Sequence, residues 1–148
     1  MNPQSSQAAP AAPKPMTLRV PIRVRYAECD PMNVVHHAVY PIWLEIARVE
    51  LLRAQGAVYA ELEKKDILFM VARLSLRYKK PAFYDEEVEV EVVCQPSAGI
   101  KIEHKYRVLR KNPANPVGGE DVLCEAETTI VCAGRDGRAK PIPEGLVP

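Results

Sequence analysis

The chain has 148 residues and a formal net charge of +1, which suits one domain with a single hydrophobic core and no general attraction to nucleic acid. No apolar run reaches the roughly 18 residues of a membrane span, and the opening MNPQSSQAAPAAPKP lacks the features of a signal peptide. We therefore expect a cytoplasmic protein with no membrane span, a disordered Pro/Ala-rich tail over 1–16, one domain over 17–142 and a short C-terminal tail over 143–148.

The first predicted element is a strand over 17–26, TLRVPIRVRY. Alternate residues from Leu18 to Tyr26 are apolar and face away from three arginines, which is the period of a half-buried strand. Pro21 cannot donate a ladder hydrogen bond, so we expect this strand at a sheet edge or at a bulge.

A long helix follows a loop that is rich in chemical groups. The segment PIWLEIARVELLRAQG has good helix formers, Pro41 where a first turn tolerates it and Gly56 where a helix ends. Its apolar side chains occupy most sides of the helix, which predicts that the helix is buried on most sides.

The loop before this helix holds Cys29, Asp30, His36 and His37 within nine positions. The free N–H groups at a helix start attract an anion, or a carbonyl oxygen that is gaining negative charge. A carboxylate at Asp30 opposite backbone N–H donors over 37–40 therefore suits attack on an acyl carbonyl.

The rest of the chain reads mainly as strands. A helical turn is predicted over 58–65, and the strand over 67–79 begins with a continuous apolar run that predicts cover on both faces. After a turn near Pro81 and Asp85, three more strands are predicted over 87–93, 100–110 and 122–133. We expect an α+β fold, with four strands in an antiparallel run after the helix and a five-stranded sheet curled around it.

The four cysteines show no CxxC pair, so we predict free thiols in a reducing compartment. Cys29 is a poor candidate nucleophile, because the neighbouring charge of Asp30 disfavours a thiolate. No recognised metal-ligand spacing joins Cys29, Asp30, His36 and His37, so no metal site is predicted.

The run Y-x-x-x-D-P-x-x-V-V-x-H-x-x-Y-x-x-x-x-E, from Tyr26 to Glu45, resembles the signature of the 4-hydroxybenzoyl-CoA thioesterase family, which includes acyl-CoA thioesterases associated with the Tol-Pal system. The later YKKPAFYDE over 78–86 resembles the same family. The resemblance implies a hotdog fold, in which an antiparallel five-stranded sheet wraps one long central helix. It also implies a dimer with active sites at the subunit interface, often within a tetramer. Asn33 replaces a usual glycine and His36 a usual aromatic, which leaves the loop's shape and the substrate preference open.

By this resemblance Asp30 is the catalytic carboxylate, which either attacks the thioester carbon or takes a proton from water. The backbone amide of His37 is the group that polarises the carbonyl. The His37 side chain and Glu45 are further catalytic candidates, although Glu45 also has the spacing for a plain ion pair with Arg48.

The candidate substrate-binding residues are Val35, Tyr40, Arg73, Arg77 and Lys79. The three basic residues either form the wet face of a strand or meet the phosphates of coenzyme A. We predict a homo-oligomeric thioesterase that hydrolyses an acyl-CoA, or an acyl carrier protein thioester, and needs no cofactor because water is the co-substrate. Two alternatives stay open, a hydratase or dehydratase on the same fold and a non-catalytic acyl-CoA-binding protein.

Overall fold

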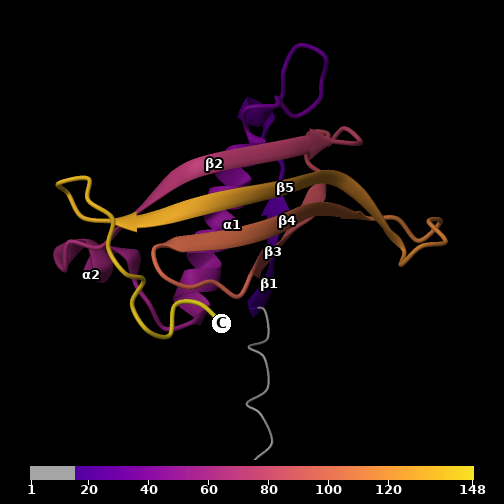
Figure 1. The fold of residues 1–148 in the computed structure, drawn as a ribbon. Helices are drawn as coiled ribbons and strands as arrows, with labels where there is room; N and C mark the ends of the chain where they lie inside the picture. Colours follow the sequence, from indigo (N-terminus) through magenta and orange to yellow (C-terminus); the bar gives the residue numbers. More distant parts are fainter. Residues whose placement is uncertain (1–15) are drawn as a thin grey trace, which may run out of the picture.

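The computed structural model describes residues 16–148, so the predicted N-terminal tail lies almost entirely outside the described residues. One long helix lies against one face of a five-stranded antiparallel sheet, which confirms the predicted α+β class (Figure 1). The strands are β1 Met16–Arg23, β2 Leu68–Tyr78, β3 Glu87–Cys94, β4 Lys101–Lys111 and β5 Glu120–Ala133. The helices are α1 Tyr40–Ala54 and the short α2 Tyr59–Lys64, with a 3₁₀ turn η1 over Tyr26–Glu28.

The strands follow the order β1-β3-β4-β5-β2 across the sheet. Strand β1 lies at one edge, as Pro21 predicted, and its ladder with β3 pairs Pro21 with Glu89. The prediction that the last four strands form a consecutive run is wrong for β2, which pairs with β5 and not with β3. The segment over 79–86 is therefore a crossover between distant strands rather than a tight turn.

The core lies between α1 and the inner face of the sheet. On β3 Val88, Val90 and Val92 are fully buried while the glutamates between them are not, because successive side chains point to opposite faces. These valines belong to one buried cluster with the inward side of α1, and each buried aliphatic side chain contributes about 1.5–3 kcal/mol. The helix residues of this cluster are Tyr40, Trp43, Leu44, Ala47 and Leu51.

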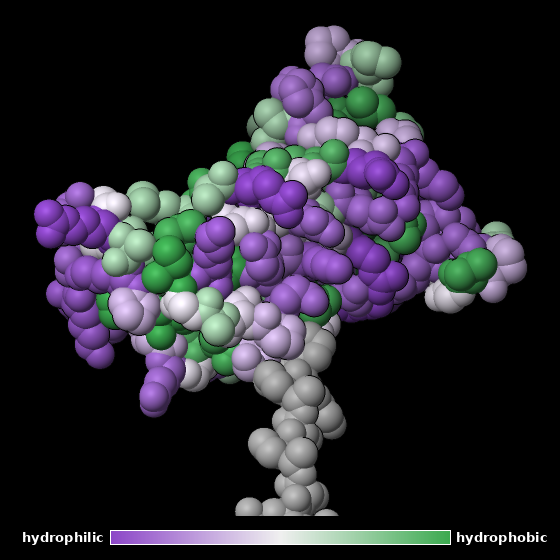
Figure 2. All heavy atoms as spheres, in the orientation of Figure 1, coloured by the Kyte–Doolittle hydropathy of each residue, from purple (hydrophilic) through white to green (hydrophobic). Residues whose placement is uncertain are grey.

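Two predictions of burial are wrong for the single chain. Ile42 and Ile46 on α1 are 51% and 41% exposed, so the helix is covered on one side only. On β2, Met70 and Val71 are also exposed, and hydrophobic residues follow the edge of the sheet where β2 runs (Figure 2). The apolar sequence indicates that these faces of α1 and β2 pack against something. Within residues 16–148 of one chain, no other segment covers them. Tyr26 is likewise exposed, because the strand ends at Arg23 and the chain turns into η1.

The four cysteines are free thiols, as predicted. Burial raises the pKa of both Cys94 and Cys124 to about 11, so these two thiols stay protonated at neutral pH. Within residues 16–148, no helix combines the length and the apolar character that crossing a bilayer requires.

Candidate active site

Asp30 begins a small hairpin loop that ends at Val35. The Asp30 amide donates to the Val34 carbonyl at 2.9 Å, and the Asn33 amide donates to the Asp30 carbonyl at 2.9 Å. Asn33 has a φ of 63°, a left-handed conformation that asparagine tolerates better than most residues. The Asp30 carboxylate is half-buried and accepts the Met32 amide on Oδ1 at 2.8 Å, while Oδ2 accepts no bond from residues 16–148. One oxygen orients the carboxylate, and the other is free for chemistry.

The crossover between β2 and β3 holds this loop in place. The Val35 amide donates to the Ala82 carbonyl at 2.9 Å, and Val34 forms a β-bridge with Phe83. Val35 was predicted to bind substrate, and the structure places it in the core, 6% exposed. The loop therefore has fixed main-chain partners on a segment that is distant in sequence.

The start of α1 is organised around His36. The Ala38 amide donates to His36 Nδ1 at 3.1 Å, and the Val39 amide donates to the His36 carbonyl at 2.9 Å. The ring therefore supplies an acceptor at a helix start whose N-cap residue, Val39, has no side-chain cap. The sequence did not predict this helix-start contact of His36, because the contact depends on how the ring turns toward the backbone.

His37 presents its amide at the same helix start. The Tyr78 hydroxyl of β2 donates to the His37 carbonyl at 2.8 Å and so holds that residue's backbone. The His37 amide has no acceptor among residues 16–148, which leaves it available at the positive end of the helix dipole. The rings of His36 and His37 lie side by side on the surface, with centroids 4.1 Å apart.

A buried aromatic group supports the helix start from below. Tyr40 is 3% exposed, with ring centroids 5.0 Å from Trp43 and 5.2 Å from Tyr78. Burial raises the pKa of Tyr40 to about 12, so its hydroxyl is neutral. Tyr40 was predicted to bind substrate, and the structure shows it as a packing residue under the loop.

Glu28 is a buried carboxylate that contacts the same aromatic group through Trp43. Its carboxylate accepts the Trp43 indole N–H at 3.2 Å and the Arg25 amide at 2.8 Å. Burial alone would raise the pKa of Glu28, but the bonds from Arg25 and Trp43 outweigh it and hold that pKa below its ordinary value. Glu28 thus connects η1, and with it the segment leading to Asp30, to α1.

The other predicted site residues lie elsewhere. Glu45 is exposed and pairs with Arg48 at 3.2 Å, which confirms the simple ion pair that its spacing predicted. Arg73 and Lys79 form ion pairs with Glu127 and Glu125 on β5, at 3.5 and 2.8 Å.

Arg77 lines a groove of about 660 Å³ across β2 to β5, with Lys105 and Arg107 among its other lining residues. This groove lies on the outer, hydrophilic face of the sheet (Figure 2), opposite the face that packs on α1. The structure therefore does not bring Arg77 together with the Asp30 loop on one face of the same chain. No cluster of three His, Cys, Asp or Glu side chains suited to a metal ion occurs within residues 16–148.

The chain resembles known proteins over most of its length. Residues 24–147 match the model of the thioesterase-like superfamily. The putative acyl-CoA thioesterase YneP of Bacillus subtilis is 34% identical over 121 residues, which are 82% of each chain. The DHNA-CoA thioesterase structure from Staphylococcus aureus aligns with a TM-score of 0.74 at 31% identity, covering 85% of this chain and 79% of that one. The 4-hydroxybenzoyl CoA thioesterase structure from Pseudomonas sp. strain CBS-3 aligns with a TM-score of 0.77 at 20% identity, covering 88% of this chain and 96% of that one, and supports the hotdog fold alone.

Proposed function

This chain belongs to the thioesterase-like superfamily, and on that premise we propose that it hydrolyses an acyl-CoA, or an acyl carrier protein thioester, to a free acid and a thiol. The observation that carries the proposal is the loop at the start of α1. It combines a carboxylate with one free oxygen, on Asp30, and a free backbone donor, on His37. Acyl transfer requires these two groups, a base or nucleophile and a donor for the developing oxyanion.

In the proposed reaction the His37 amide donates to the carbonyl oxygen of the thioester as that oxygen becomes negative. Asp30 acts in one of two ways. Either Oδ2 attacks the carbonyl carbon, the C–S bond breaks and water hydrolyses the resulting mixed anhydride, or Oδ2 takes a proton from the water that attacks. Both routes consume one water and release one acid and one thiol, so no metal or redox cofactor is needed. The His37 ring is exposed beside the loop and is the second side chain that we place near substrate.

We also propose that the enzyme works as a homodimer or a homotetramer, with the site completed at the interface. The open side of α1 carries Ile42, Glu45 and Ile46, close to the helix start that His37 precedes. A partner covering this side would bring its own residues to the loop. Glu45, and basic residues such as Arg77 from another subunit, would then meet substrate in the assembly. The free thiols agree with the reducing cytoplasm that we propose as its location.

The deciding experiment compares wild type with Asp30→Asn on a panel of acyl-CoA substrates. We expect kcat to fall at least about a thousandfold, as for other nucleophile or base removals, with KM changed only a few-fold. Product is followed by the thiol released, because a hydratase or dehydratase releases none.

Asp136→Asn is the matched control, because Asp136 is an exposed aspartate whose Oδ1 accepts a nearby amide, that of Arg138. Full turnover by Asp30→Asn would remove Asp30 from the reaction. Binding of acyl-CoA by wild type without turnover would show a non-catalytic binding protein.

A further inference from the structure

A second cavity lies far from the Asp30 loop, between the C-terminal half of α1, α2 and the inner face of the sheet. It holds about 40 Å³, with a rim of half-buried residues that includes Val49 and Phe69. Its floor is buried and mostly apolar, with Leu51, Ile130 and Leu146 among its residues. The cavity is therefore a small apolar pocket that is open at its rim.

Two unpaired polar atoms indicate what kind of ligand this pocket binds. Within residues 16–148, the buried side-chain nitrogen and oxygen atoms without a hydrogen-bond partner are Gln55 Oε1 and His104 Nδ1. Both residues line this same pocket. Buried polar atoms are paired in the great majority of cases, so two unpaired atoms on residues that line one pocket favour a ligand that pairs with them.

The two unpaired polar groups of the pocket are neutral. His104 is 8% exposed, and burial together with the nearby Arg48 lowers its pKa to about 4, so the ring is neutral at pH 7. A neutral imidazole has one nitrogen that donates and one that accepts. Arg48 is engaged by Glu45 at 3.2 Å. A carboxylate or phosphate would therefore meet two neutral polar groups and a guanidinium that is already paired, which favours a neutral ligand.

A hydroxyl group fits this chemistry, because one hydroxyl can both donate, as Gln55 Oε1 requires, and accept, as the tautomer of His104 that is protonated on Nδ1 requires. The size limits what carries the hydroxyl, since a cavity that holds benzene is about 150 Å³, and this one is about 40 Å³. We propose that the pocket binds the hydroxyl end of an alkyl chain, with the methylene groups against Phe69 and Leu52.

Two sources can supply such a chain, the far end of an acyl substrate or a free alcohol. From Tyr40 to Val49 along α1 is about 13 Å at about 1.5 Å per residue. A medium-length acyl chain is long enough to cover that distance. This source rests on the proposed function, and it makes the enzyme selective for ω-hydroxyacyl thioesters.

The first arm of the test measures hydrolysis of straight-chain acyl-CoAs and of their ω-hydroxy counterparts of equal length. At one chain length we expect the hydroxylated substrate to have a kcat/KM about tenfold higher, as two net hydrogen bonds allow. Gln55→Leu and His104→Phe should abolish this ratio. Gln95→Leu should keep it, because Gln95 lines the outer groove instead. Thermal unfolding checks that each variant folds, and Gln55→Leu carries the test if His104→Phe does not.

The second arm needs no hydrolysis. The ring resonances of His104 are followed by NMR during titration with 1-butanol, and with its isomer diethyl ether, which accepts hydrogen bonds but does not donate them. We expect the alcohol to shift these resonances and the ether to leave them unchanged. Alcohol binding without an ω-hydroxy preference would assign the pocket to free alcohols, and it would stand even if no thioester were hydrolysed. No preference and no alcohol binding, with only an ordered water between Gln55 and His104 in a crystal, would overturn the proposal.

Discussion

Tyr78 connects the sheet to the residue whose amide we propose as the oxyanion donor. Its hydroxyl donates to the His37 carbonyl at 2.8 Å, and its ring lies edge-on to Tyr40 at 5.2 Å. Burial raises the pKa of Tyr78, so the hydroxyl remains a donor at neutral pH. The contact fixes His37 without touching the reacting atoms, which makes Tyr78 a positioning residue.

Tyr78→Phe should therefore lower kcat by about tenfold while leaving KM nearly unchanged, because the ring still packs but the His37 backbone is no longer held. The loss of stability should be about 1 kcal/mol, the usual net value of one hydrogen bond. Steady-state kinetics and thermal unfolding measure the two effects. Tyr106→Phe is the control, since it removes a buried hydroxyl that is bonded to Thr128 at 3.0 Å. Equal losses of kcat in both variants would contradict a specific role for Tyr78.

The contacts and conformations of single residues could be predicted from the sequence to different degrees. The Glu45–Arg48 pair was predictable from its spacing on a helix, and the left-handed Asn33 from the few residue types that accept such a turn. The contact of Tyr78 with His37 spans 41 positions and depends on how β2 lies beside the loop. No local pattern encodes such a contact.

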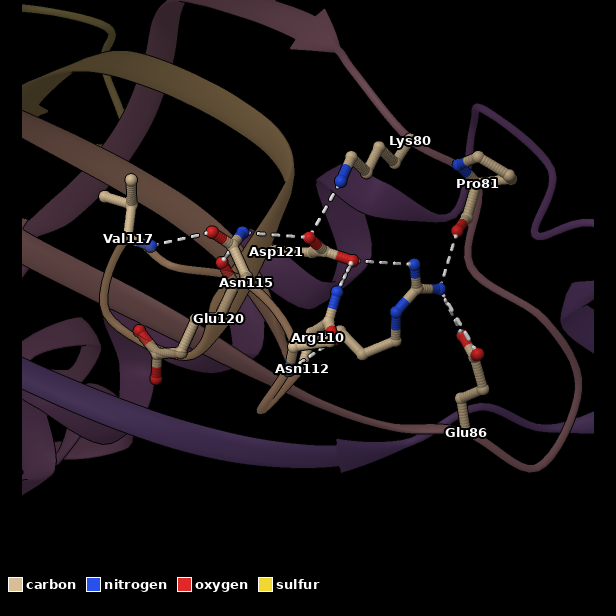
Figure 3. Close-up of polar contacts among 10 residues, drawn as sticks. Lys80, Pro81, Glu86, Arg110, Asn112, Asn115, Val117, Glu120 and Asp121 are labelled. Atoms are coloured by element: carbon tan, nitrogen blue, oxygen red, sulfur yellow. Dashed lines mark hydrogen bonds and ion pairs between the residues drawn. The ribbon is translucent and has the colours of Figure 1, made fainter.

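At the scale of elements, the crossover and the loop between β4 and β5 are joined by a partly buried polar cluster (Figure 3). Arg110 donates to the Pro81 carbonyl at 3.1 Å and to both Glu86 oxygens. It also donates to Asp121 at 3.3 Å, and Lys80 donates to the same carboxylate at 2.7 Å. Because the crossover carries the Ala82 carbonyl that holds the Asp30 loop, this cluster supports the proposed site from outside.

The cluster predicts an acid-sensitive contribution to stability from Asp121. Hydrogen bonds from Lys80, and then from Asn115, Asn112 and Arg110, hold the pKa of Asp121 well below its usual range. The folded state then binds fewer protons than the unfolded chain, whose aspartate pKa is about 3.9. The stabilisation is complete well above that value and is lost as the pH falls through it toward the folded-state pKa.

Asp121→Asn should accordingly lower Tm at pH 7, and the difference from wild type should shrink below about pH 4. Thermal unfolding followed by circular dichroism across pH 2–7 measures this difference. Asp136→Asn, at an exposed turn, should show a small difference at every pH. A difference for Asp121→Asn that stayed constant down to pH 2 would show that the carboxylate's charge does not contribute.

The elements themselves were largely predictable, because alternation and helix signals are local. The positions of β3, β4 and β5 agree with the predicted strands to within one or two residues. The pairing of β2 with β5 was missed, because the crossover over 79–86 has the composition of a turn. Composition does not show whether a turn returns to the neighbouring strand or passes across the sheet.

At the scale of the whole molecule, the two edges of the sheet differ. The β1 edge includes Pro21, which limits pairing with another strand. The β2 edge carries exposed Met70, Val71 and Leu74, and it lacks a strand on its outer side within residues 16–148. Long, exposed apolar edges of this kind commonly pair or pack with another chain. We therefore place the proposed dimer contact along β2 and the open side of α1.

Leu74→Arg should weaken this dimer, because it puts an unpaired charge into an apolar contact. We expect the dimer dissociation constant to rise at least about tenfold, and activity to fall at concentrations where the variant is monomeric. Analytical ultracentrifugation and activity at matched concentrations test both effects. Val117→Arg is the control, because Val117 is also an exposed apolar residue but lies on the β4–β5 loop, away from β2. An unchanged dimer in Leu74→Arg would move the interface elsewhere.

The sequence by itself determined the fold class, the free cysteines and the stretch that carries the proposed chemistry, because periodicity, spacing and the motif from Tyr26 to Glu45 are properties of neighbouring residues. Only the tertiary structure decided that Val35 and Tyr40 are packed in the core, that His36 and Tyr78 organise the helix start, and that β2 is an open edge. It also brought Gln55 and His104 to one pocket. The physical reason is that a side chain's partner depends on which distant segments pack beside it, and that arrangement minimises the free energy of the whole chain at once.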